Sequence, residues 1–348
     1  MDKSEYLARI KSEYPLRHIA DMISKFRKIK AIVIGDTIID EYHFTIPKGR
    51  AIKDPILSVD YIKDEAYLGG ILAVANHVSN FVDEVTCVTA LGDREDKRDF
   101  IENAVNNNVK LKFFVKEDSP TTVKRRYLNI IHKEKLFKVE NINDSPISSA
   151  VEKEFSDYLR QELPKRELVL VGDFGHGLVT DSIIKVIEEN SNYLSVNAQC
   201  NSANLGFNYI TRYRIPSFVT MDVQELRYAV ADRFSDVSTL MNKLYDKAGF
   251  SKFLVTMSKE GSGFFNAGEK IFSPAFVMRP QDTVGAGDAV FSVASLFAYC
   301  NYDKIIPFIS NCVGGIAVSY MGNKEYITRE GLLKFIGQVY NGNKEVHS

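Results

Sequence analysis

The sequence predicts an α/β protein built on a doubly wound, mostly parallel sheet flanked by helices, with a second, smaller β-sheet inserted into it. Short apolar runs that end in a polar residue alternate with helical stretches, first at residues 31–36 and again beyond residue 152. Strands that are apolar on both faces belong to parallel sheets covered by helices on both sides. Residues 43–68 and 111–141 instead contain short β-prone pieces with polar interruptions, which favours a separate sheet.

Apolar residues recur at near-helical spacing in the first part of the chain, from residue 4 to residue 27. This pattern predicts one or two amphipathic helices, interrupted at Pro15, that pack on the rest of the protein. We therefore expect a helical extension, residues 1–28, followed by one domain that spans residues 29–342.

The segment 111–141 contains three β-prone pieces, LKFFV, TTVKRRYLNII and LFKVE, separated by a loop and a polar turn. Three such pieces in a row predict an antiparallel meander, which would form the small sheet together with residues 43–68. Between the two segments, residues 68–81 carry a glycine pair followed by an apolar pattern of helical period.

Strand and helix patterns alternate again in the second half of the chain. Apolar runs end near Asp173, Asn197, Asp222 and Ser258, and a last β-prone piece, KIFSP, follows them. Ligands of such sheets bind at the carboxyl ends of the strands. Asn197 and Gln199 follow one of these ends and would line the cleft, although their residue types indicate no mechanism.

The composition excludes several classes of function. The 348 residues include 44 basic and 45 acidic side chains, so no nucleic-acid or membrane surface is indicated. No apolar run approaches the roughly 20 residues of a membrane span, and the start has no signal-peptide core. Four cysteines without metal-site spacing favour free thiols in a reducing compartment. We expect a soluble, cytoplasmic protein.

The most informative stretch is DTVGAGD, residues 282–288, which precedes a long apolar run. It predicts a tight loop that opens a buried helix, with the amides of Gly285, Ala286 and Gly287 free to bind a phosphate. Asp288 would then remove the proton from the attacking hydroxyl. Its place at a helix N-terminus predicts a lowered pKa. The alternative is a glycine-rich turn with an aspartate helix cap.

DTVGAGD resembles the second signature, D-T-x-G-A-G-D, of the ribokinase-like (PfkB) carbohydrate kinase family, and the resemblance extends over about residues 30 to 340. It implies a ribokinase-like fold, ATP and Mg²⁺ as cofactors, Asp288 as the catalytic base, and Gly285, Ala286 and Gly287 as the anion hole. The family's small sheet is a lid over the sugar site and often a homodimer contact. A lid also suits a kinase because water must be excluded. The resemblance leaves open whether a monovalent cation is a further cofactor.

Two segments resemble the sugar-binding parts of this family. Asp36 and Asp40 lie at the end of the first strand, where the family's acids bind sugar hydroxyls; turn and cap chemistry is the alternative. Gly69 and Gly70 resemble the first signature, G-G-x-x-N-x-A, and would let backbone approach the ligand. Ala73 replaces the expected Asn of that signature, which leaves two nearby polar residues as possible substitutes, Asn76 and His77.

Lys124 and Arg126 alternate along one β-prone piece, so both side chains point the same way and could face one anionic group. A solvated face is the alternative. The run PTTVKRRYL followed by FKVE resembles the heptose-phosphate kinase branch of the family, in which such cations would meet the phosphate that the sugar already carries. Lys138 and Glu140 fall in the second of these segments, and His176 replaces a lysine of a third.

Asp222 and Glu225 are spaced to lie on one face of a first helical turn, which suits hydrated Mg²⁺. Acids that complement the helix dipole are the alternative. The resemblance further implies nucleotide contacts, with Ser258 in place of a family glycine, from Ser258, Gly261, Thr283 and Asn311.

The sequence therefore predicts an ATP-dependent sugar kinase whose acceptor is a sugar phosphate such as a heptose 7-phosphate. One alternative is a ribokinase- or nucleoside-kinase-like enzyme that acts on an uncharged substrate. Another is a sugar- or nucleotide-binding protein without catalysis, which the departures Ala73, His176 and Ser258 suggest.

Overall fold

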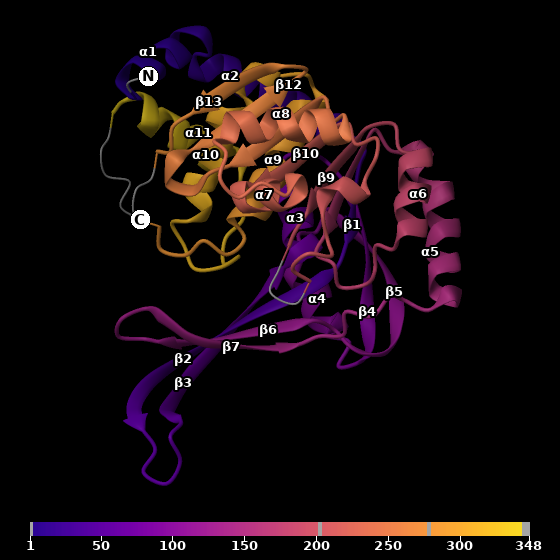
Figure 1. The fold of residues 1–348 in the computed structure, drawn as a ribbon, viewed down its shortest axis with the longest axis vertical. Coiled ribbons are helices and arrows are strands. Elements are labelled where there is room, and N and C mark those ends of the chain that lie inside the picture. Colours follow the sequence, from indigo (N-terminus) through magenta and orange to yellow (C-terminus); the bar gives the residue numbers. More distant parts are fainter. Residues whose placement is uncertain (1–2, 201–203, 277–279, 343–348) are drawn as a thin grey trace.

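The computed structural model describes residues 3–200, 204–276 and 280–342. In this part of the chain nine strands form the main sheet, in the order β13-β12-β11-β10-β9-β8-β1-β4-β5 (Figure 1). Neighbours from β5 to β11 are parallel, while β12 and β13 continue the sheet antiparallel. The strands are β1 (Ala31–Gly35), β4 (Val85–Arg94), β5 (Val109–Pro120), β8 (Leu168–Asp173), β9 (Leu194–Ala198), β10 (Phe218–Asp222), β11 (Lys252–Thr256), β12 (Ser262–Asn266) and β13 (Glu269–Ser273).

Helices cover both faces of this sheet. The central strand β1 shows why: Ala31 and Val33 belong to one hydrophobic core, Ile32 and Ile34 to another, and all four are fully buried. The first core is closed by α3 (Gly70–Ser79), α4 (Arg98–Ala104), α9 (Ala286–Tyr299), α10 (Ile306–Ala317) and α11 (Arg329–Tyr340). The second is closed by α5 (Ser149–Glu162), α6 (Asp181–Asn190), α7 (Val223–Val230) and α8 (Val237–Ala248).

The expected N-terminal helices are present as α1 (Lys3–Glu13) and α2 (Leu16–Ser24), and Pro15 is the N-cap of the second. Their apolar faces join the first core, because Ile10 and Ile19 are buried among its residues. The hydroxyl of Tyr340 in α11 also donates to the main-chain oxygen of Tyr14 at 2.7 Å. The described residues of this extension are therefore an integral part of the packing.

The small sheet projects from the body as an arm (Figure 1) and has the strand order β3-β2-β6-β7. Its strands are β2 (Thr37–Arg50), β3 (Leu57–Gly69), β6 (Val123–Asn129) and β7 (Glu134–Asn141). The expected three-piece meander is wrong in its first piece, residues 111–115. That piece lies in β5 at the edge of the main sheet, parallel to β4, and Phe114 packs there in the second core.

The order of the main sheet reverses between β1 and β8, since the chain continues through β4 and β5 on one side and β9 to β11 on the other. Ligands bind beyond the carboxyl ends of the strands at such a switch point. The arm leaves the body at this same place, because β2 follows β1 after Asp36. None of the described helices has the length and apolar character needed to cross a membrane.

Candidate active site

Two adjoining pockets open at the carboxyl ends of the strands, with volumes of about 310 and 590 Å³. Both fall in the range typical of ligand sites, roughly 300 to 1,000 Å³. Five residues line both pockets, so they form one cleft: Asp222, Thr256, Thr283, Gly287 and Val290. We call the smaller one, next to the arm, the polar pocket and the larger one, beside α10, the second pocket. The DTVGAGD loop lies between the two.

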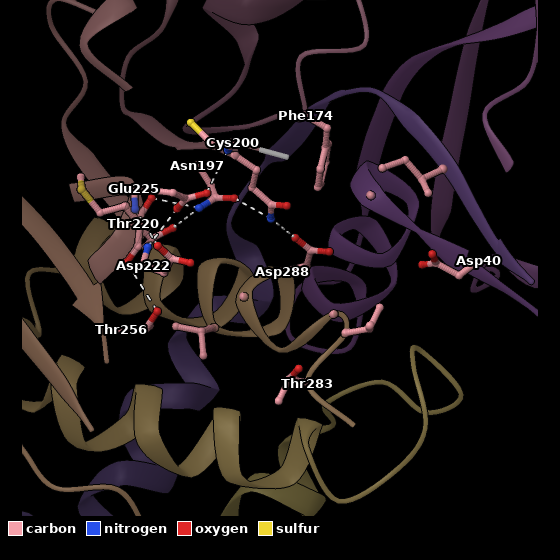
Figure 2. Close-up of a pocket in the computed structure, with 18 of the residues that line it drawn as sticks. Asp40, Phe174, Asn197, Cys200, Thr220, Asp222, Glu225, Thr256, Thr283 and Asp288 are labelled. Carbon is pink, nitrogen blue, oxygen red and sulfur yellow. Dashed lines mark hydrogen bonds between the residues drawn. The ribbon is translucent and has the colours of Figure 1, made fainter. Parts of the chain in front are cut away.

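Asp288 lies in the first turn of α9 and points into the polar pocket, between Asp40 on one side and the Asp222 and Glu225 pair on the other (Figure 2). Only 7% of the residue is exposed. One carboxylate oxygen, Oδ1, accepts a hydrogen bond of 2.8 Å from Nε2 of Gln199. Oδ2 has no hydrogen bond from the described residues, so it is available to a ligand.

The expected lowered pKa of Asp288 is wrong. Burial first, and then the nearby Asp40 carboxylate, raises the pKa to about 7. The hydrogen bond from Gln199 and the charge of Lys124 act in the opposite direction but do not offset the loss of water. A carboxylate with a pKa near neutrality is a stronger base than an exposed aspartate.

The loop before Asp288 presents main-chain amides to the cleft. Within the described chain, the amides of Gly285 and Gly287 have no acceptor, whereas that of Ala286 makes a long bond of 3.4 Å to the oxygen of Thr283. Gly285 has φ +80°, and a Cβ there would lie 1.9 Å from Oδ1 of Asn323. Only glycine fits this conformation and space.

Asp282, the first residue of the same loop, joins the loop to the arm. Its buried carboxylate accepts hydrogen bonds from Tyr42 of β2 at 3.0 Å and from Lys135 of β7 at 2.6 Å. The main-chain amides of Val284 and Gly322 donate to it as well. Burial alone would raise the pKa of Asp282, but Lys135 and the other donors lower it below the ordinary value.

Asp36 was expected to bind substrate, and the structure corrects this expectation. Its carboxylate accepts from the main-chain amides of Phe174, His176 and Leu178, at 3.1 to 3.3 Å, and so holds the loop after β8. It does not line either pocket of the cleft. Burial first, and then the nearby Asp173, raises its pKa to about 7.

Asp40 does line the polar pocket, where it forms an ion pair of 2.5 Å with Arg126. A Cβ on Gly69 would lie 2.4 Å from Oδ2 of Asp40, and Gly70, with φ +54°, lines the pocket itself. The two expected substitutes for the missing Asn point elsewhere. The side chain of Asn76 bonds to Ala104 and Asn106, while His77 is fully buried and accepts from the amide of Ile327.

Lys124 and Arg126 both line the polar pocket, while Arg125 between them pairs with Glu41 at 2.7 Å on the opposite face of the arm. Lys124 has no hydrogen bond or ion pair with any described residue. Burial lowers its pKa. The carboxylates of Asp40 and Glu140 act on its charge from a distance. A desolvated ammonium with no direct hydrogen bond or ion pair from the described residues is suited to an anionic ligand.

The other three residues named from the heptose-kinase resemblance, Lys138, Glu140 and His176, do not line the polar pocket. Lys138 pairs with Glu140 at 2.9 Å. His176 is neither exposed nor in the cleft: it is buried beside Asp144, with 2.9 Å between Nδ1 and Oδ1. Burial lowers its pKa to about 3, which keeps the ring neutral.

Asp222 and Glu225 form a capping box at the start of α7, in which each side chain accepts from the other's amide. The second oxygen of Glu225 accepts from the amide of Cys200 at 3.1 Å. Burial first, and then Asp222, raises the pKa of Glu225 to about 8. Oδ2 of Asp222 faces the cleft without a hydrogen bond from the described residues. No group of three or more typical metal ligands exists in the described chain. One or two carboxylates are what proteins usually contribute to a Mg²⁺ ion that keeps most of its water ligands.

The second pocket is lined by all four residues for which nucleotide contacts were expected. Ser258 has φ +53°, so it adopts the left-handed conformation natural to the glycine it replaces. A Cβ on Gly261 would lie 2.0 Å from the main-chain oxygen of Ser273. Asn311 donates to the oxygens of Ser273 and Pro274, which supports the pocket wall, and Thr283 reaches both pockets.

The structure brings further polar residues into the polar pocket. Asn197 and Gln199 line it, as the strand end suggested, together with Thr220 and Thr256, which the sequence analysis did not single out. Thr256 is the last residue of β11, and Thr220 lies two residues before the end of β10. Their closeness to the carboxyl ends of these strands was the available signal.

The profile of the pfkB family of carbohydrate kinases matches residues 30–300. The chain belongs to this family. It is 24% identical over 315 residues to the bifunctional protein HldE of Geobacter metallireducens, covering 88% of this chain and 63% of that protein. The chain thus spans less than two thirds of the length of such curated relatives.

Solved structures share the fold at low identity. Escherichia coli phosphofructokinase-2 in complex with potassium gives a TM-score of 0.70 at 12% identity, and in complex with fructose-6-phosphate 0.69 at 10%. Arabidopsis thaliana ribokinase complexed with ribose and ATP gives 0.66 at 15%. Each alignment covers 89% of this chain and 99% of the other. The expected ribokinase-like fold is confirmed.

Replacing the buried acid should stabilise the protein in a pH-dependent way. Because the folded pKa of Asp288, about 7, lies above its ordinary value of 3.8, its contribution to stability is lost as the pH rises between these values. We expect Asp288→Asn to raise the melting temperature by several degrees near pH 8, and by less as the pH approaches 4. Thermal melts across this range measure the difference. The exposed Asp54→Asn is the control, and a gain independent of pH would contradict the explanation.

Proposed function

We propose that this carbohydrate kinase transfers the γ-phosphoryl group of ATP to a hydroxyl of a sugar phosphate, with Asp288 as general base. The observation that carries the proposal is the position of Asp288. Its buried carboxylate lines the polar pocket directly after Gly287, which lines both pockets, and it has one oxygen free and a pKa near neutrality. A hydroxyl bound in the polar pocket would meet this oxygen, while a nucleotide in the second pocket would bring its terminal phosphate to the loop.

Each step of the proposed transfer is assigned to residues that line the cleft. Asp40 and the main chain at Gly70 hold the acceptor, and Asp288 takes the proton of its hydroxyl as the oxygen attacks the phosphorus. The amides of Gly285 and Gly287 stabilise charge on the transferred group, with a smaller share from Ala286. Mg²⁺, held through water by Asp222 and Glu225, would neutralise charge on the nucleotide phosphates.

The position of Lys124 is the reason for assigning a phosphorylated acceptor. Its unpaired ammonium, with Arg126 beside it, faces the polar pocket, where an uncharged sugar would leave it without a partner. The likeness to the heptose-phosphate kinase branch points to a heptose 7-phosphate. The bound fructose-6-phosphate of Escherichia coli phosphofructokinase-2 supports the same class of acceptor. That enzyme's complex with potassium makes a monovalent cation a further candidate cofactor.

We also propose that the arm covers the acceptor and joins two copies of the chain. Four rings cross its outer face, one from each strand: Tyr61, His43, Tyr127 and Phe137. His43 stacks on Tyr127 at 4.7 Å between ring centroids, and Tyr127 on Phe137 at 4.5 Å. Tyr61 and Phe137 are 58% and 44% exposed, which is unusual for large apolar groups gathered on one face. A second arm would bury them.

The first test is turnover of ATP with Mg²⁺ and a panel of acceptors, measured as ADP release. We expect phosphorylated sugars to be preferred over free ribose, fructose and adenosine. Asp288→Asn should lower kcat by about three orders of magnitude or more, with nucleotide binding retained in calorimetry. A preference for free sugars or adenosine would move the acceptor to the uncharged class. No turnover with any acceptor would favour a binding protein, and an unaffected Asp288→Asn rate would exclude this base.

Lys124→Met tests the acceptor's phosphate. The KM for the phosphorylated sugar should rise roughly tenfold to a hundredfold, because a charge-assisted contact is lost, while the KM for the unphosphorylated sugar changes little. The matched control is Arg125→Met, on the opposite face of the arm. An equal effect on both acceptors would place Lys124 at the transferred phosphoryl group instead. The assays should be run near pH 8.5, above the pKa of Asp288, so that this carboxylate is ionised in Lys124→Met and in Arg125→Met.

Phe137→Glu tests the homodimer. We expect the wild-type chain to sediment as a dimer at micromolar concentration and the variant as a monomer, because a charge would be buried in the contact. Phe234→Glu, on a ring that is 89% exposed and lies outside the arm, is the control. A monomeric wild-type protein, or a variant that still dimerises, would show that the outer face has another role.

A further inference from the structure

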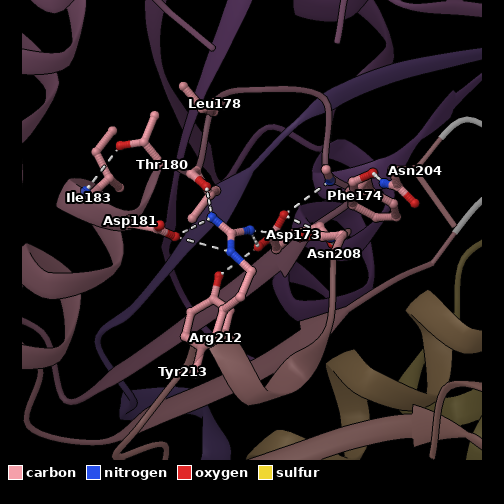
Figure 3. A network of polar contacts seen from close by, with 12 residues as sticks. Asp173, Phe174, Leu178, Thr180, Asp181, Ile183, Asn204, Asn208, Arg212 and Tyr213 are labelled. Atoms are coloured by element: carbon pink, nitrogen blue, oxygen red, sulfur yellow. Dashed lines mark hydrogen bonds and ion pairs between the residues drawn. The ribbon is translucent and has the colours of Figure 1, made fainter. Parts of the chain in front are cut away.

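A largely buried polar network joins the end of β8 to residues that follow β9 in the chain (Figure 3). Its centre is Asp173 at the end of β8, which is 1% exposed. The carboxylate accepts from Arg212 at 3.2 Å, from the hydroxyl of Tyr213 at 3.0 Å and from Nδ2 of Asn208 at 3.1 Å. Arg212 in turn donates to Oδ1 of Asn208 at 2.7 Å. These bonds fix the position of Asn208 from both ends of its amide group.

The network holds the main chain of Gln199. The amide of Gln199 donates to the main-chain oxygen of Asp173 at 2.9 Å, and Nδ2 of Asn208 donates to the main-chain oxygen of Gln199 at 3.2 Å. Both main-chain polar groups of Gln199 are thus bound to residues of the network that the buried Asp173 and the half-buried Arg212 hold in place. Gln199 projects from this support into the cleft, which it lines.

The side chain of Gln199 is held as tightly as its main chain. Nε2 carries two protons and has two acceptors, Oδ1 of Asn197 at 3.1 Å and Oδ1 of Asp288 at 2.8 Å. Asn197 is itself oriented by its bonds to Thr220, at 2.9 and 3.1 Å. The direction of the Gln199 amide follows from this pairing, since a flipped amide would turn its oxygen toward two acceptors.

We propose that Gln199 is the positioning residue of the base: it fixes the carboxylate of Asp288 so that Oδ2 faces the acceptor hydroxyl. This inference rests on the proposed role of Asp288 and adds a residue for which the sequence indicated no mechanism. A carboxylate in the first turn of a helix can rotate between several orientations. A donor on Oδ1 removes this freedom before the substrate binds, which lowers the cost of reaching the reactive geometry.

Several charged groups around Asp288 raise or lower its pKa. Asp40 from the arm and Glu225 from α7 disfavour its ionised form, while Lys124 from β6 favours it. The hydrogen bond from Gln199 also favours the ionised form. Loss of this donor should therefore raise the pKa of Asp288, and a cationic donor in its place should lower it.

The experiment compares Gln199→Leu, which removes the donor at similar volume, with Gln199→Lys, which supplies a charged one. In the pH dependence of kcat/KM for a sugar phosphate, we expect the acid limb of the wild-type enzyme near pH 7. The limb should move up by about one pH unit in Gln199→Leu and down in Gln199→Lys. The plateau kcat of Gln199→Leu should also fall, roughly tenfold, because the base loses its orientation. Gln161→Leu and Gln161→Lys, on the exposed face of α5, are the matched controls.

A second measurement does not need turnover. The carboxyl carbon of Asp288, labelled with carbon-13 and assigned with Asp288→Asn, can be titrated by NMR in the wild-type protein and in both variants. The same opposite shifts are expected. A protein without kinase activity would refute the proposed function, and the titration would still decide whether Gln199 controls this carboxylate. Unchanged limbs and titrations, or shifts of the same sign in both variants, would overturn the inference.

Discussion

The withdrawal of the Asp288 carboxylate from water is the constraint on which the site depends. An ionised carboxylate in an apolar interior costs several kcal/mol unless hydrogen bonds and opposite charges compensate for the lost hydration. Here the side chain is held in the first turn of α9 by a fully packed helix, so it cannot move out to solvent. The compensation is incomplete, and the high proton affinity that results is the property that a general base requires.

Other buried acids near the cleft show the contrast. Asp36 and Asp282 each accept several hydrogen bonds, among them from main-chain amides, and each fixes the course of a loop. Asp173 is surrounded by Arg212, Tyr213 and Asn208 in the same way. Asp288 differs because a single side chain bonds to it and one oxygen stays open. The number of satisfied acceptors thus separates the carboxylates that support the structure from the one that is open to a ligand.

The repeated pattern of apolar strands and the DTVGAGD loop made the fold and the location of the cleft predictable, because both depend on local sequence. The alternation of Lys124 and Arg126 was sufficient to place them on one face. Asp36 could not be told from Asp40, since its role is set by amides more than 130 residues away. The pKa of Asp288 depends on burial by distant elements, and β5 resembled the arm because an edge strand alternates polar and apolar residues. The direction of Asn76 and His77 likewise follows from tertiary packing.

The arm is attached to the body through more than its own chain. Asp282 shares its carboxylate between Tyr42 and Lys135 of the arm and the amides of Val284 and Gly322 of the body. Swinging the whole arm outward would remove two of these four donors, including the only cation among them. The loop of residues 282–288 is consequently bound to the arm at two separate points, Tyr42 of β2 and Lys135 at the turn end of the β6–β7 hairpin. A bend that keeps both bonds is confined to the parts of β2 and β3 that extend beyond Tyr42.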